Sequence, residues 1–138
     1  MNPIVAANKW LYAVLTADAT IAGLVGTKVI GEVVPTDVNP PYIYYTLTAP
    51  EPNLQTLEAN TIWSSLLYTV RMVDRAESYN NLETGAAAIV DALNRASGSN
   101  ASGVILASVY VQPFALMEID RAGFELRHLG AQFRLFLQ

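Results

Sequence analysis

The stretch of sequence that decides the fold runs from Trp10 to Tyr45 and reads WLYAVLTADATIAGLVGTKVIGEVVPTDVNPPYIYY. Apolar residues at helical spacing begin just upstream of it and predict an amphipathic helix, and Asn2 followed by a proline predicts the capped start of that helix. Asp18 predicts the cap of a second, shorter helix. Gly26 predicts its end, because glycine tolerates the left-handed conformation that commonly follows a helix.

Strands are expected after these helices. Residues 29–30 and 33–34 predict a short strand interrupted at Gly31, and three prolines predict a loop over 35–41. Residues 42–49 are rich in aromatic and β-branched side chains and predict a strand. Its odd-numbered positions 43, 45 and 47 share one face. The even-numbered positions from Tyr42 to Thr48 share the other.

The rest of the chain predicts one more helix and further strands. Residues 50–60 predict a long loop or a flexible hairpin tip, and residues 62–73 the longest strand. Ser78 predicts the cap of a helix whose small residues, from Gly85 to Ala88, let it lie close to a sheet. A flexible loop is expected over 97–103, and a strand over 104–112 that stops at Pro113. Paired segments are expected over 114–119 and 124–137, with a bulge or bend at Gly130.

The order helix, helix, strands, helix, strands predicts the fold class. Only one helical crossover is available, so antiparallel strands joined by short turns fit better than a parallel sheet. A length of 138 residues suits one domain spanning 1–138. The sequence therefore predicts a single α+β domain, in which two helical regions pack on a mostly antiparallel sheet.

Composition points to a partner protein. Charged residues make up 14% and hydrophobic residues 52% of the chain, against about 25% charged residues in an average domain. Exposed apolar area of this kind often marks an interface. The net charge of −4 and the scattered basic residues argue against tight binding of nucleic acid. The start of the chain lacks signal-peptide features and no apolar run could span a bilayer, so we expect it to stay in the cytoplasm or to leave as part of an assembly.

No stretch predicts catalysis, a cofactor or a metal site. Residues 23–28 resemble a phosphate-binding loop only superficially, because a helix ends there instead of starting. His128 is the single histidine and cysteine is absent, so nucleophilic catalysis and transition-metal binding are disfavoured, and His128 is expected to be a partly exposed strand residue. Glu118 and Asp120 are expected to mark a solvated strand edge, and Trp10, Trp63 and the tyrosines to serve a core or an interface.

A resemblance to a known family runs through most of these elements. It is carried by LYAVLTADA from Leu11, IAGLVG from Ile21, VI at Val29 and PYIYY from Pro41. It continues in LYTV from Leu67, AAAIVDAL from Ala86 and GAQFRL from Gly130. These segments resemble the tail-completion, or tail-terminator, proteins of long-tailed bacteriophages and prophages. Residues 50–60 and 113–123 match no part of that pattern.

The resemblance implies a structural virion protein without enzymatic activity. Such a protein forms a ring, typically six-fold, at the head-facing end of the tail tube, where it ends tube polymerisation and joins the tail to the head–neck. It implies a homo-oligomer, the tail tube protein and a head-closure or neck protein as partners, and DNA that passes through the channel without specific binding. The expected location is the virion tail or neck, after synthesis in the cytoplasm of a bacterial host.

A ring closes through two different patches that meet. We hypothesise that the exposed face of the strand over 62–73 and the loop over 50–60 form such patches. Another neck component, or less plausibly an unrelated small-molecule-binding domain with a pocket near His128, remains an alternative. The candidate interface residues are Leu54, Leu57, Ile62, Trp63 and Arg71.

Overall fold

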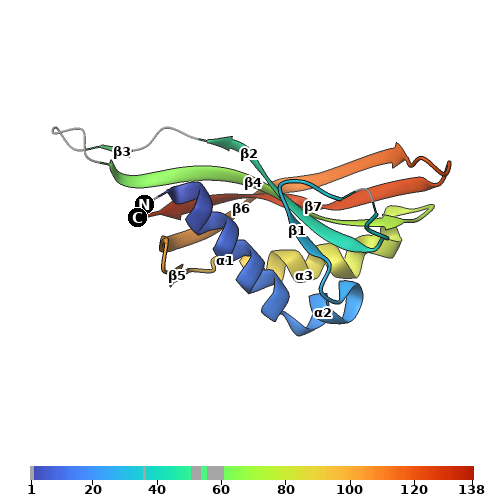
Figure 1. Ribbon diagram of the computed structural model, residues 1–138, viewed down its shortest axis with the longest axis horizontal. Helices are drawn as coiled ribbons and strands as arrows, with labels where there is room; N and C mark the ends of the chain where they lie inside the picture. Colours follow the sequence, from blue (N-terminus) through green and yellow to red (C-terminus); the bar gives the residue numbers. More distant parts are fainter. Residues whose placement is uncertain (1, 36, 51–53, 56–60) are drawn as a thin grey trace.

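A computed structural model describes residues 2–35, 37–50, 54–55 and 61–138. Three helices lie on one side of an elongated, twisted sheet (Figure 1). This arrangement confirms the predicted α+β class. The elements are α1 (Pro3–Ala17), α2 (Ala19–Val25), β1 (Val29–Gly31), β2 (Tyr42–Pro50), β3 (Leu54–Gln55), β4 (Thr61–Arg75), the 3-10 turn η1 (Tyr79–Leu82), α3 (Glu83–Leu93), β5 (Gly98–Asn100), β6 (Gly103–Ile119) and β7 (Glu125–Leu137).

The predicted helix signals at Asn2, Asp18 and Gly26 are confirmed, whereas Ser78 caps a 3-10 turn that precedes α3, and α3 itself has no side-chain cap. The Asn2 side chain accepts hydrogen bonds from the backbone N–H groups of Ile4 and Val5, and the Asp18 carboxylate accepts one from Ile21 N–H. Gly26 ends α2 with a φ of 65°. Ser78 caps η1, which leads directly into α3. These local contacts satisfy backbone donors that a helix end leaves without partners.

The sheet has the strand order β1-β2-β4-β7-β6-β5, and β3 pairs with the start of β4. Each described pair of neighbours is antiparallel, except that β1 runs parallel to β2. The helices cover one face, where a core of apolar side chains from α1, α3, β4 and β7 is fully buried. Its largest members are Leu11, Leu15, Tyr68, Ile89, Leu93, Phe133 and Leu135.

Tight packing in this core depends on small residues, as predicted for α3. A Cβ atom at Gly85 would collide with the sulfur of Met72, so α3 lies close against β4. On the opposite face, Val34 and Val38 of the loop after β1 pack on a second cluster formed by Tyr42, Val73 and Leu126. The central strands are therefore covered on both faces over part of their length.

Five expectations for the strands are wrong. β1 ends at Gly31, so residues 33–34 form no strand. Residues 98–100 form β5 and turn back onto β6, so part of the expected loop over 97–103 is a hairpin. The longest strand is β6, which continues through Pro113. A proline is tolerated there because that side of β6 needs no N–H for pairing with β7.

The fifth wrong expectation is the bulge at Gly130. The pairing of β7 with β4 and with β6 is regular through this residue, so there is no bulge. A Cβ atom at Gly130 would lie 2.6 Å from the Cα atom of Arg71. The glycine is therefore needed because β4 and β7 approach each other closely at this point.

Candidate subunit interface

One end of the sheet brings two predicted interface residues together. Leu54 of β3 pairs with Trp63 of β4, and the preceding residue Ile62 belongs to the same strand. Trp63 is 40% exposed, and the centre of its ring lies 5.5 Å from the centre of the Phe136 ring on β7. Leu57 lies outside the described residues. An exposed tryptophan beside a second aromatic ring has the composition of an interface anchor.

Arg71 lies on the same, helix-free face of β4 as Trp63, but well away from it along the strand. Its guanidinium group stacks between two aromatic rings, 4.7 Å from the centre of Tyr44 on β2 and 4.9 Å from the centre of Phe114 on β6. These cation–π contacts bridge the sheet across β7. The structure therefore does not join Arg71 to the exposed patch around Trp63.

His128 differs from its prediction, because it is buried, with 5% of its surface exposed. Its Nε2 atom lies 2.8 Å from Oε1 of Glu118 on the neighbouring strand β6. A carboxylate only accepts hydrogen bonds, so Nε2 carries the proton, while Nδ1 is buried without a partner among the described residues. Burial lowers the pKa of His128, against the opposing effect of its hydrogen bond to Glu118, so the neutral imidazole is favoured.

A shallow hollow of about 370 Å³ opens beside this histidine on the helix-free face. Two acids, one arginine and the histidine contribute to it, and the described residues contain no group of three or more His, Asp or Glu side chains that could hold a metal ion. The lining residues are Glu32, Val33, Val34, Tyr42, Tyr44, Arg71, Leu116, Glu118 and His128.

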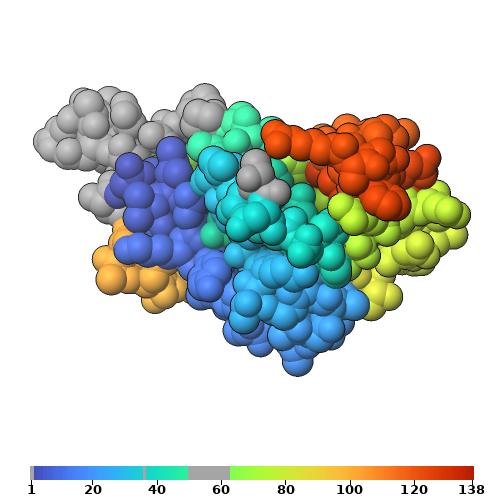
Figure 2. Space-filling view, turned by 45° about the vertical axis from the view of Figure 1, so that its right-hand side comes forward, coloured from blue at the N-terminus to red at the C-terminus, as the bar shows by residue number. Residues whose placement is uncertain are grey.

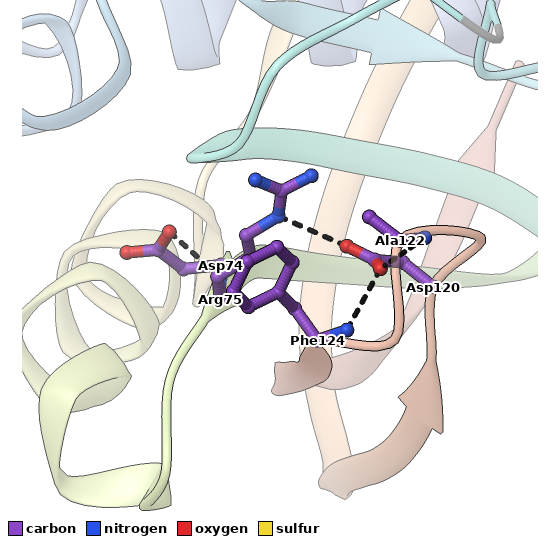
Figure 3. A network of polar contacts seen from close by, with 5 residues as sticks. All are labelled: Asp74, Arg75, Asp120, Ala122 and Phe124. Atoms are coloured by element: carbon purple, nitrogen blue, oxygen red, sulfur yellow. Dashed lines mark hydrogen bonds and ion pairs between the residues drawn. The ribbon is translucent and has the colours of Figure 1, made fainter.

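The turn between β6 and β7 is held by Asp120 (Figure 3). Its carboxylate accepts hydrogen bonds from the N–H groups of Ala122 at 2.9 Å and Phe124 at 3.0 Å, and from Nε of Arg75 at 2.9 Å. The hydrogen bond from Phe124 is the main reason why the pKa of Asp120 is lowered. The guanidinium group of Arg75 also lies 4.7 Å from the centre of the Phe124 ring. The end of this hairpin is thus tied to the end of β4.

Sequence reasoning missed the surface of β6. Its far half carries exposed apolar side chains on both faces, namely Leu116 at 42%, Met117 at 44% and Ile119 at 59% exposure. The hairpin end that contains them stands at one end of the molecule, away from β5 (Figure 2). Residues 111–119 contain a single charged residue, Glu118. This shortage of charge is the sequence signal that could have predicted an exposed apolar surface here.

The geometry defines a small α+β domain with helices on one face of a twisted antiparallel sheet and exposed apolar surface on its last hairpin. No protein-family model matches the chain, and no curated protein does. Among solved structures, a chain from a "Virion of native gene transfer agent (GTA) particle" shares the fold, with a TM-score of 0.69 and 21% sequence identity. The match covers 96% of this chain and 96% of that chain. No helix in the described part of the chain is both long and apolar enough to cross a membrane.

Proposed function

We propose that this protein is a structural component of a phage-like virion, and that it acts as a tail terminator. In this role it forms a ring, six-fold in symmetry, at the head-proximal end of the tail tube, ends polymerisation of the tube and joins the tail to the neck. The observation that carries the proposal is the fold shared over 96% of both chains with a chain of a virion particle. The sequence resemblance to tail-completion proteins supports the finer role.

The surface of the molecule fits an assembly subunit. Apolar side chains are exposed at both ends of the sheet, at Trp63 on one end and at Leu116, Met117 and Ile119 on the other. Two different patches are what a closed ring requires, because each subunit contacts two neighbours through different surfaces. The net charge of −4 also suits a channel through which DNA slides, since few cations are available to hold phosphates.

We place one ring contact at the end of the sheet formed by β3 and the start of β4, with Leu54, Leu57, Ile62 and Trp63. Arg71 contributes by holding β2, β4 and β6 together through its two ring contacts. Trp63→Lys should block assembly while leaving the fold intact, because the side chain is 40% exposed. Val33→Lys is the matched control, because Val33 is 76% exposed and lies far from this end.

Removing the gene from a particle-producing strain tests the role directly. The expected result is overlong tail tubes in electron micrographs, and complementation with the wild-type or Val33→Lys protein should restore normal tubes. Full-length free tails beside unjoined heads would refute the terminator role and indicate a head-closure or head–tail joining protein instead. Labelled protein found away from the joint between head and tail would refute both.

A small-molecule-binding domain is the second candidate, and the hollow beside His128 is the observation that favours it. Arg71, Glu118 and His128 converge there, as polar groups do in ligand sites. The test is to record the imidazole signals of His128 by NMR while small anionic and cationic metabolites are added. Chemical-shift changes that saturate would support this candidate, and unchanged signals would eliminate it.

A further inference from the structure

The outer edge of β6 lacks a partner strand over its far half. In the described part of the chain, β5 pairs only with residues 103–105 of β6. Residues 94–96, which follow α3, bind the next backbone groups along this edge. Arg95 N–H donates to Ser108 O, Ser108 N–H donates to Ala96 O, and Tyr110 N–H donates to the Asn94 side chain. Beyond Tyr110, no described residue covers this edge.

The backbone groups that point outward can be assigned from the pairing pattern. Asp120 N–H donates to Phe124 O, and Gly123 N–H to Asp120 O, where β6 turns into β7. Opposed residues in an antiparallel pair alternate between exchanging hydrogen bonds and not exchanging them. Counting back from Asp120, the residues whose N–H and C=O groups point away from β7 are Ala115, Met117 and Ile119. Pro113 is the next in the series and has no N–H to satisfy.

This edge lacks the usual protection against pairing with another chain. Natural edge strands are guarded by lysines, prolines, bulges or short length. Here Pro113 and the register shift at 110–112 lie at the start of the free segment, and the six residues after Pro113 contain one charge, Glu118. The Glu118 carboxylate is engaged by His128 over β7, so it does not guard the edge.

We propose that a second copy of this protein docks on this edge, with its own β6 antiparallel to the first around a two-fold axis at Met117. In that register Ala115 lies opposite the partner's Ile119, so a small side chain faces a large one at both ends of the contact. Glu118 lies opposite the partner's Leu116 and never opposite its own copy. Each outward residue exchanges two backbone hydrogen bonds with the residue opposite it.

A second copy is a better occupant than a charged or polar partner because the edge is apolar on both faces. Leu116 is exposed on one face, and Met117 and Ile119 on the other. An identical strand offers the same apolar pair of faces in return, and two-fold dimers are the most common symmetric assembly. The proposal concerns the free subunit before assembly and does not rest on the proposed function. A closed ring would need this end of the sheet for a neighbouring subunit, so the two copies would separate before the ring forms.

Sedimentation velocity of the purified full-length protein at tens of micromolar tests the pairing. Wild type and Tyr12→Lys should sediment with the mass of a dimer, because Tyr12 is 49% exposed on α1 and does not belong to the β6 hairpin. Met117→Lys should sediment as a monomer, because it places two like charges on the axis. Met117→Pro should do the same, because it removes an outward N–H group while leaving the pairing with β7 intact, as Pro113 already does. Circular dichroism checks that both Met117 variants keep the wild-type fold.

Covalent trapping gives a second readout. The chain contains no cysteine, so Met117→Cys and Tyr12→Cys each introduce a single thiol. Facing residues in such a pair have Cα atoms about 5.5 Å apart, within reach of a disulfide. Mild oxidation should convert Met117→Cys, and not Tyr12→Cys, to a covalent dimer. A wild type of monomeric or ring mass, a folded Met117→Pro variant that stays dimeric, or a failure of Met117→Cys to cross-link would each overturn the proposal.

Discussion

Replacing Gly130 with alanine tests whether β4 and β7 are as close as the structure shows. The added Cβ atom would lie 2.6 Å from Arg71 Cα and closer still to the carbonyl oxygen of Val70. Both atoms belong to the backbone of a central strand, which pairs with β7 from Ser64 to Arg75. Neither can rotate away as a side chain would, so the two strands must separate.

The size of the effect follows from that separation. Non-bonded carbon atoms are comfortable at about 3.5–4.0 Å, so the strands must move apart by about 1 Å. Overpacking an interior usually costs about 1–3 kcal/mol. We expect about 3 kcal/mol here, because backbone has to move. With a urea m-value of about 2 kcal/mol/M, the unfolding midpoint should fall by about 1.5 M.

Urea unfolding followed by far-UV circular dichroism measures this change, with two other glycines as controls. Gly23 lies in α2 with nothing within 4 Å of an added Cβ atom, so Gly23→Ala should raise stability by about 0.5–1 kcal/mol. In Gly85→Ala the added Cβ atom meets the flexible Met72 side chain, so the unfolding midpoint of this variant should lie between those of Gly130→Ala and Gly23→Ala. An unchanged midpoint for Gly130→Ala would refute the close approach of β4 and β7.

Three further predictions concern single polar groups. The pKa of His128 is lowered in the fold, so its contribution to the free energy of unfolding is complete above the pKa of about 6.5 in the unfolded chain and is lost as the pH falls below that value. Urea unfolding at pH 7.5 and at pH 5 should show this loss of stability, and the His128→Gln variant should lack this part of the pH dependence. The Tyr68 hydroxyl is buried and donates to Asn8 Oδ1 at 2.6 Å, so Asn8→Ala should cost about 1–3 kcal/mol, whereas Tyr68→Phe in the Asn8→Ala background should recover part of the loss in urea unfolding. Asp18→Ala removes the cap of α2 and should lower the free energy of unfolding by about 0.5–2 kcal/mol, whereas Asp18→Asn should cost little.

Local signals in the sequence predicted the helices well. Caps at Asn2 and Asp18 and the glycine at the end of α2 act within a few residues, so their chemistry can be recognised without knowledge of the fold. The two faces of β2 were also predicted, because alternation is a property of the strand itself. The fold class followed from the order of these elements.

Features that depend on neighbouring strands could not be predicted. Pro113 ends a strand only if its N–H side faces a partner, and the sequence does not disclose that this side of β6 is an edge. His128 is buried because β7 lies between β4 and β6, and strand order is a tertiary property. The position of Arg71 between two aromatic rings is a further example, because it depends on which strands flank β4 and β7. Glu118 and Asp120 did predict a solvated strand edge, but the exposed apolar surface of β6 was missed because its apolar residues resemble those of a buried strand.

The arginine between two aromatic rings has a consequence for evolution. The guanidinium group of Arg71 reaches from Tyr44 to Phe114 across the residue that pairs with both β4 and β6, and that residue is Gly130. These four positions come from four strands and share one small volume, so we expect them to change together among related proteins. A related protein that replaces Arg71 should also lose one of its two aromatic partners. It can carry a larger side chain at position 130 only if β4 and β7 lie farther apart.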